Sequence, residues 1–190
     1  MLAGRSAALD SLRVLLVDEG GLLARLLDAD STPDDCAVAQ SSERVEPEGP
    51  AQIAASGPRT NGSSAKYELL VEAIYEGYLL HYGAPRVVIA ADADVRVLAG
   101  DRLYALGLAR LVELGDTFAV AELADTITLS ALAQGAGDAP LAEAIWAAGA
   151  RAVGWGSSDQ HDRAKELVAA GAPEAIEAMR TSAQDAAASP

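Results

Sequence analysis

The clearest pattern in the chain is a stripe of apolar residues between positions 67 and 82. Its members recur at intervals of three and four, which is the period of one face of an α-helix. The stripe comprises Tyr67, Leu70, Val71, Ile74, Tyr75, Tyr78, Leu79 and Tyr82. Ser63 or Ser64 can cap its start, and Gly83 followed by Pro85 ends it. The pattern predicts a helix over 67–82 that buries one side.

The segments that follow are also helical in pattern. Residues 95–114 are apolar around most of the helix circumference, which is expected of a central helix surrounded by others. Shorter apolar repeats, separated by glycine or proline, predict further helices over 117–134, 140–153, 159–170 and 173–182. No segment alternates between apolar and polar residues as a strand does. We therefore expect an all-α fold, an antiparallel helical bundle with short connections.

The first third of the chain has a different pattern. Residues 1–30 contain two short apolar runs separated by Gly20-Gly21, which predicts two short helices that dock on another surface. Residues 31–65 are rich in Ser, Pro, Gly and acidic side chains, which predicts a disordered internal linker. The expected organisation is thus a helical docking segment (1–30), a linker (31–65), a bundle domain (66–183) and a disordered tail (184–190).

Composition and charge narrow the classes of function. The chain has 190 residues, of which 51% are hydrophobic but only 4% aromatic, and it is rich in alanine, which favours helix over sheet. Its net charge of −14 repels phosphate backbones and anionic lipid, so we expect no nucleic-acid partner. The single cysteine, Cys36, cannot form an intramolecular disulfide. No secretory signal or transmembrane segment is evident, so a cytoplasmic location is expected.

Residues that could carry chemistry are few. Asp101 lies inside the apolar helix 95–114, where we expect a buried or rim hydrogen bond that fixes helix register, with Gly100 and Gly107 allowing another helix to approach closely. His81 is placed to bond the last carbonyls of its own helix. His161 falls in a first helical turn, and neither histidine has the second ligand at helical spacing that a zinc site needs. These residues alone predict no catalytic site and no metal site.

Several motifs resemble those of a known all-α family, the trans-isoprenyl diphosphate synthases, or polyprenyl synthetases. The first is Leu79-Leu80-His81, which is followed after a short loop by Leu98-Ala99-Gly100-Asp101, similar to the start of the family's "LAGDYLLA" helix. Leu114-Gly115-Asp116 and Leu132-Ala133-Gln134-Gly135 continue the pattern at similar intervals. The resemblance covers about Tyr67 to Asp138, and it implies a truncated isoprenoid-synthase-like bundle.

The departures from the family are informative. Catalytic members follow "LLH" with an aspartate-rich DDxxD motif that binds magnesium and the allylic diphosphate, whereas this chain has Tyr82-Gly83-Ala84-Pro85 there. The adjacent pair Asp34-Asp35 lies in the predicted linker, and no second aspartate-rich motif follows Asp138. The chain is therefore most similar to the small, non-catalytic subunit, of the component I type, of two-component heptaprenyl or hexaprenyl diphosphate synthases.

This resemblance implies a hetero-oligomer in which a catalytic large subunit binds the magnesium, while this chain binds no cofactor and has no activity on its own. It implies that Tyr75, Tyr78, Leu79 and Tyr82 form part of the partner interface or of a wall that limits the growing polyprenyl chain. His81, Gly100 and Asp101 are then structural residues of the family motif. Two alternatives remain open: a helical scaffold or adaptor unrelated to isoprenoids, and an active prenyltransferase with an atypical site.

Overall fold

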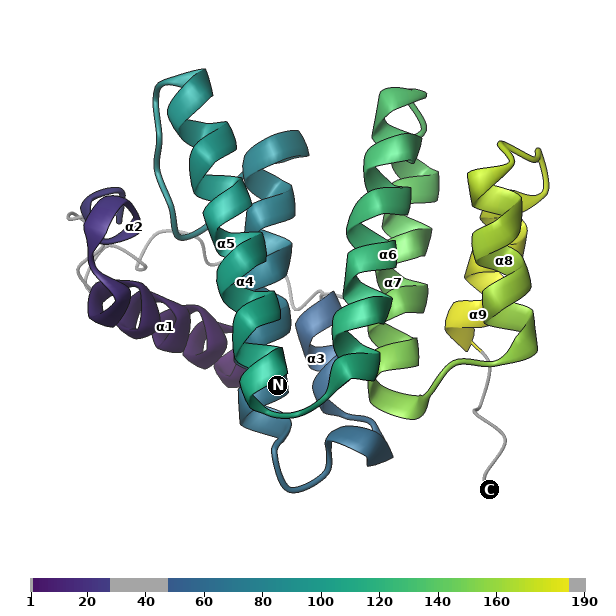
Figure 1. The fold of residues 1–190 in the computed structure, drawn as a ribbon, viewed down its shortest axis with the longest axis horizontal. Coiled ribbons are helices and arrows are strands. Elements are labelled where there is room, and N and C mark those ends of the chain that lie inside the picture. Colours follow the sequence, from purple (N-terminus) through teal and green to yellow (C-terminus); the bar gives the residue numbers. More distant parts are fainter. Residues whose placement is uncertain (1, 28–47, 185–190) are drawn as a thin grey trace.

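The computed structural model describes residues 2–27 and 48–184, and within these ranges the chain is built of α-helices (Figure 1). The long helices are α1 (Leu2–Glu19), α4 (Ser64–Tyr82), α5 (Ala93–Glu113), α6 (Thr117–Gly135) and α7 (Ala139–Trp155). The shorter elements are α2 (Gly21–Arg25), α3 (Pro50–Ala55), the 3₁₀ turn η2 (Pro58–Thr60), α8 (Asp159–Ala169) and α9 (Ala175–Gln184). No strand occurs in the described residues, so the predicted all-α fold is confirmed.

Two antiparallel helical hairpins form the centre of the molecule. One is α4–α5 and the other is α6–α7, and the short helix α3 packs against both α4 and α7 (Figure 1). The α8–α9 pair covers the outer side of the second hairpin, and α1 crosses the first hairpin on the opposite side. Among the residues described, no helix is both long enough and apolar enough to cross a membrane.

Polar side chains fix where several helices begin. Asp92 accepts hydrogen bonds from two backbone N–H groups at the start of α5. Asp116 and Asp138 cap α6 and α7 in the same manner, and the Ser158 hydroxyl caps α8. Each cap satisfies an N–H group that has no partner inside its helix. These acids therefore perform structural work at helix ends, where their charge also complements the helix dipole.

The N-terminal segment packs on its own bundle. Leu12 and Leu16 of α1 and Leu23 of α2 are buried in one apolar cluster with Val88 and Leu103. Glu19 at the end of α1 forms ion pairs with Arg102 and Arg110 of α5. The break expected at Gly20-Gly21 is present, because Gly20 adopts a φ of 67° that favours glycine. The surface on which the predicted docking segment lies is thus the α4–α5 hairpin.

The predicted linker 31–65 extends too far towards the bundle. Helix α3 and the turn η2 lie inside this range, and α4 begins at Ser64 rather than after residue 65. Ala51 and Ala54 are fully buried, and the Thr60 hydroxyl donates to the Ala54 carbonyl (3.0 Å). Small side chains let α3 fit between two helices, although the surrounding composition resembles that of a loop. The rest of the linker, 31–47, and the tail beyond Gln184 lie outside the described residues.

Candidate functional site

Glycines bring α4 and α5 into close contact. A Cβ atom added at Gly107 would lie 2.3 Å from Cγ1 of Ile74, and one at Gly100 would lie 3.0 Å from the Gly77 carbonyl oxygen. The 2.3 Å distance leaves no room for a larger side chain unless the helices separate, and the 3.0 Å distance to a backbone oxygen would require a shift of a few tenths of an ångström. The close approach that the sequence predicts at Gly100 and Gly107 is therefore present in the structure.

The family-motif residues meet at this crossing. His81, on the last turn of α4, lies with Nε2 3.2 Å from Oδ1 of Asp101, and its ring stacks on Tyr104 of α5 with centroids 5.3 Å apart. Asp101 is 64% exposed, so its contact lies at the rim and not in the core. The Leu80 carbonyl near the end of α4 is bonded by Arg96 (3.0 Å), whereas the Nε2 edge of His81 faces Asp101.

The tyrosine stripe forms a ladder of rings along α4. Tyr75 and Tyr78 lie 5.7 Å apart between ring centroids, and both pack on Trp146 of α7, at 5.0 and 5.2 Å. Tyr82 continues the ladder 5.4 Å from Tyr78, and Gln134 of α6 donates a hydrogen bond to the Tyr78 hydroxyl (2.6 Å). The ladder therefore joins the two hairpins through side chains.

Only the end of this ladder is open to a partner. Tyr78 is buried, Tyr75 and Leu79 are half-buried, and Tyr82 is 45% exposed. Burial raises the pKa of Tyr75 and of Tyr78, so both hydroxyls keep their protons near neutral pH. Of the four residues predicted to form an interface or a wall, Tyr82 is the one with substantial exposed surface.

Sequence reasoning missed a buried acidic cluster on α4. Glu72 and Glu76 lie one turn apart and both are buried, and Arg86 forms an ion pair with each. Glu76 Oε1 also accepts hydrogen bonds from the backbone N–H groups of Arg86 (2.7 Å), Val87 (2.7 Å) and Val88 (3.2 Å). A carboxylate with this many donors is well compensated for burial. It fixes the loop before α5 against α4.

This loop also anchors the N-terminal segment. The backbone N–H of Ile89 donates to the carbonyl of Leu26 (2.8 Å), and Leu27 pairs with Val88 as an isolated antiparallel bridge. Glu76 therefore holds the backbone of this loop in place, and the residues after α2 pair with that backbone. No motif spacing could have revealed this, because the partners of Glu76 are backbone groups of a loop ten to twelve positions away.

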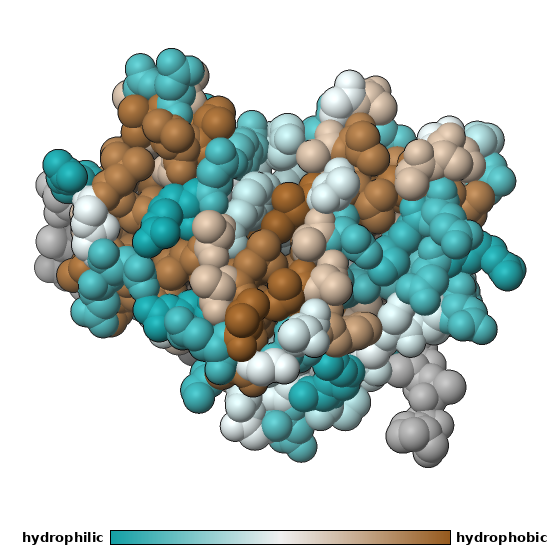
Figure 2. All heavy atoms as spheres, in the orientation of Figure 1, coloured by the Kyte–Doolittle hydropathy of each residue, from teal (hydrophilic) through white to brown (hydrophobic). Residues whose placement is uncertain are grey.

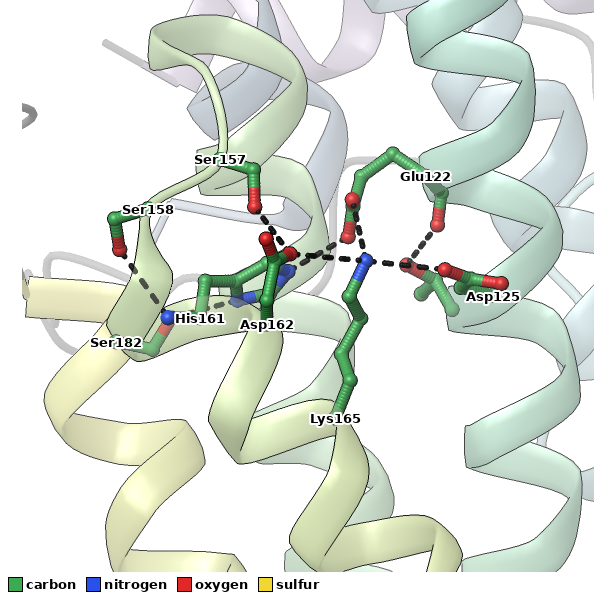
Figure 3. A network of polar contacts seen from close by, with 9 residues as sticks. Glu122, Asp125, Ser157, Ser158, His161, Asp162, Lys165 and Ser182 are labelled. Carbon is green, nitrogen blue, oxygen red and sulfur yellow. Dashed lines mark hydrogen bonds and ion pairs between the residues drawn. The ribbon is translucent and has the colours of Figure 1, made fainter.

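A second buried network joins α6, α8 and α9 (Figure 3). His161 of α8 lies between two partners, with Nε2 2.7 Å from Oε1 of Glu122 and Nδ1 2.6 Å from Oγ of Ser182. Lys165, one turn further along α8, donates to Oε2 of Glu122 (3.0 Å) and to Asp125 (3.0 Å). The sequence places His161 correctly in a first helical turn but gives no indication of these partners, which are 39 and 21 positions away.

Electrostatics in this network favour an ionised carboxylate. Burial alone would raise the pKa of Glu122, but the hydrogen bond from His161 and the charge of Lys165 hold it below its usual value. Burial works to lower the pKa of Lys165, yet Glu122 and Asp125 together raise it. The pair is therefore charged at neutral pH, and its hydrogen bonds are made between neighbouring helices.

The order serine, histidine, carboxylate resembles the connectivity of a hydrolase triad. A nucleophile must reach a substrate, however, and Glu122, His161 and Ser182 are only 3%, 3% and 4% exposed. Lys165 also forms an ion pair with Glu122, the carboxylate that would orient the histidine in a triad. We therefore assign the network a structural role: its hydrogen bonds and ion pairs hold α8 and α9 against α6.

The fold and these clusters define a class: an all-α protein whose buried polar groups connect helices. Within the described ranges, no group of three or more His, Cys, Asp or Glu side chains is arranged to hold a metal ion. Asp34-Asp35 and Cys36 lie outside those ranges. Comparisons with family models, with curated proteins and with solved structures found no match.

Proposed function

We propose that this chain is a non-catalytic accessory subunit of a polyprenyl diphosphate synthase in isoprenoid biosynthesis. In this proposal it acts in the cytoplasm, bound to a catalytic large subunit that holds the magnesium ions and the allylic diphosphate. The observation that carries the proposal is the convergence of His81 with Gly100 and Asp101, which belong to separate motifs of the resemblance but meet at one helix crossing.

The placement of the acids supports a non-catalytic role. Magnesium bound to a diphosphate needs several carboxylates that face one cavity. Here Asp92, Asp116 and Asp138 cap helices, and Glu76 and Glu122 bind groups of their own chain. These acids are engaged in holding the helices together, so the proposal assigns the metal to the partner.

The direct test is reconstitution with a large subunit. A polyprenyl diphosphate synthase encoded beside this chain would be co-expressed with it, and the complex would be assayed with magnesium, isopentenyl diphosphate and an allylic diphosphate. We expect a stable complex whose long-chain product requires both subunits. A large subunit that neither binds this chain nor changes its product in its presence would contradict the proposal.

Among the tyrosines of the ladder, Tyr82 is the best position at which to test the predicted partner interface. Tyr82→Ala removes the exposed ring without opening the core, whereas Tyr78→Ala would leave a cavity beside Trp146. We expect Tyr82→Ala to weaken the complex or shift product length, and Tyr82→Phe to retain both properties. Unchanged affinity and product length in Tyr82→Ala would remove the ladder from the proposal.

A helical scaffold or adaptor is the second candidate, because the buried contacts of Glu76 and Glu122 hold segments of the described chain together. The same reconstitution separates the candidates. Stable binding to a structurally unrelated protein, with no effect on prenyl transfer, would favour the scaffold. Turnover by the isolated chain with magnesium would instead favour an atypical prenyltransferase.

A further inference from the structure

The outer face of α5 is unusually apolar for a surface helix. Leu98 is 59% exposed and Val112 is 57% exposed, and Ala105 is exposed between them. Figure 2 shows brown, hydrophobic residues at the upper part of α5 and along the seam between α5 and α6 on the viewed face, with hydrophilic residues between these two areas. Isolated exposed apolar residues are ordinary, but a group of them on one helix face is typical of an interaction surface.

The spacing of these residues indicates what kind of surface they fit. Leu98, Ala105 and Val112 are seven residues apart, and Asp101 and Leu108 fall between them at the alternate heptad position. A repeat of 3.5 residues presents a straight seam to a second helix, as in a coiled coil. Ala105 leaves room for the partner's side chain, while Asp101 places one carboxylate within an otherwise apolar seam.

The charges around the face select the occupant. Asp101 is 64% exposed and contacts His81, whereas Arg102 and Arg110 are held by Glu19 of α1 and Arg110 also pairs with Glu113. Among the described charged side chains of this face, Asp101 is therefore the carboxylate that has no Lys or Arg partner. A second copy of the chain would bring another net charge of −14, which opposes self-association. The chain's own segment 28–47 has six acidic residues and one arginine, so its charge is also of the wrong sign.

We propose that the outer face of α5 docks an α-helix of a partner protein, and that this helix carries an apolar stripe flanked by Lys or Arg, one of which pairs with Asp101. The inference rests on the proposed function, since it assigns the surface through which the accessory subunit holds its catalytic partner. Binding of a basic, amphipathic helix to this face can also be tested directly with a synthetic peptide.

The probe is a designed helical peptide with leucine at the a and d heptad positions and lysine at the e and g positions, and its binding to the full chain is followed by fluorescence anisotropy. We expect Leu98→Asp/Val112→Asp to weaken binding by at least about tenfold. The matched control is Val14→Asp/Val17→Asp, which alters two equally exposed valines on α1. Circular dichroism would verify that both double variants keep their helix content.

Charge exchange tests the role assigned to Asp101. Asp101→Lys should weaken binding of the lysine peptide and favour a matched peptide that carries one glutamate opposite that position. Equal affinity of wild type and Leu98→Asp/Val112→Asp for the lysine peptide would overturn the inference. Dimerisation of the chain through this face in analytical ultracentrifugation would also overturn it, in favour of a second copy.

The two proposals fail in different ways. If a synthase large subunit co-purifies equally with wild type and with Leu98→Asp/Val112→Asp, the outer face of α5 is not the docking surface, but the accessory role remains. If the lysine peptide binds at the α5 face but no synthase subunit binds or responds, the surface is right and the accessory role is wrong.

Discussion

Single buried carboxylates in this bundle connect segments that are separate in the sequence. Glu76 gathers three backbone N–H groups of a loop, and Glu122 holds His161 and Lys165 of a neighbouring helix. A buried carboxylate is tolerated only where such partners replace the water that it loses. The specificity of the fold in these places therefore depends on individual atoms, and single substitutions at them should have large effects.

Replacing Glu122 with glutamine should uncouple α8–α9 from α6. His161 and Lys165 would lose their anionic partner, and breaking a buried ion pair from one side costs about 3–5 kcal/mol. Urea unfolding at pH 7 would measure this loss. Asp125→Asn, which removes a mostly exposed partner of the same Lys165, should cost less than about 1 kcal/mol. Equal losses of unfolding free energy in both variants would show that Glu122 does not hold α8–α9 against α6.

The same residue predicts a dependence of stability on acid. Because the folded pKa of Glu122 lies below its ordinary value of 4.5, its contribution is complete above that value and is lost as pH falls through the folded pKa. Wild type should therefore lose this increment of stability below about pH 4.5, and Glu122→Gln should lack this part of the acid dependence. The free energy of unfolding of both proteins would be measured between pH 6 and pH 3. If it changes with pH by the same amount in wild type and in Glu122→Gln, the role assigned to Glu122 is wrong.

Tyr67 gives a second prediction at the residue scale. Burial, and then its hydrogen bond to Oδ2 of Asp116 (2.7 Å), raise its pKa from 10.0 to about 12. The stabilisation from the neutral hydroxyl is complete below pH 10 and is lost as pH rises towards 12. Tyr67→Phe should thus reduce the late rise in tyrosinate absorbance at 295 nm by the share of one tyrosine, since the pKa values of Tyr75 and Tyr78 are also raised, and it should cost about 1–2 kcal/mol at pH 7. Tyr82→Phe, at an exposed site away from Asp116, serves as the control and should leave the stability at pH 7 nearly unchanged.

At the scale of elements, local patterns predicted most of the helices well. The stripe over 67–82 became α4 at Ser64–Tyr82, and the expected helix over 117–134 became α6 at Thr117–Gly135, because apolar period and capping residues are encoded locally. Helix α3 was missed because its six residues are too few to show a period. The His161 network was missed because its contacts join separate helices, and one sequence carries no information about such pairs.

The α4–α5 crossing makes a prediction that separates packing from helix propensity. Gly107→Ala adds a methyl group 2.3 Å from Ile74, which forces the helices apart and should cost about 1–3 kcal/mol despite the better helix propensity of alanine. Gly135→Ala on α6 meets no atom within 4 Å and should be neutral or slightly stabilising. Thermal melting of both variants tests this, and a stable Gly107→Ala would show that the crossing tolerates a larger separation.

At the scale of the whole molecule, the two hairpins depend on a small set of bridging side chains. Trp146 of α7 packs against Tyr75 and Tyr78 of α4, and α3 fills the space between the same two helices. At the other end, Arg59 in η2 binds Asp116 at the start of α6. Trp146 is nearly fully buried at the centre of this arrangement, so it should determine whether the hairpins unfold together.

Trp146→Ala should cost about 3–5 kcal/mol and separate the unfolding of the two hairpins, because it removes the aromatic surface between them and leaves a cavity. Trp146→Phe should cost much less, since a ring remains against the tyrosines and the indole N–H has no hydrogen-bond partner among the described residues to lose. Urea unfolding followed by circular dichroism and by tyrosine fluorescence would give coincident transitions for Trp146→Phe and separate ones for Trp146→Ala. Trp155→Phe, which removes a half-buried ring that lies over Arg151, serves as the control and should keep a single transition. If Trp146→Ala also unfolds in one step, the hairpins are held together chiefly by α3 and by the Arg59–Asp116 contact.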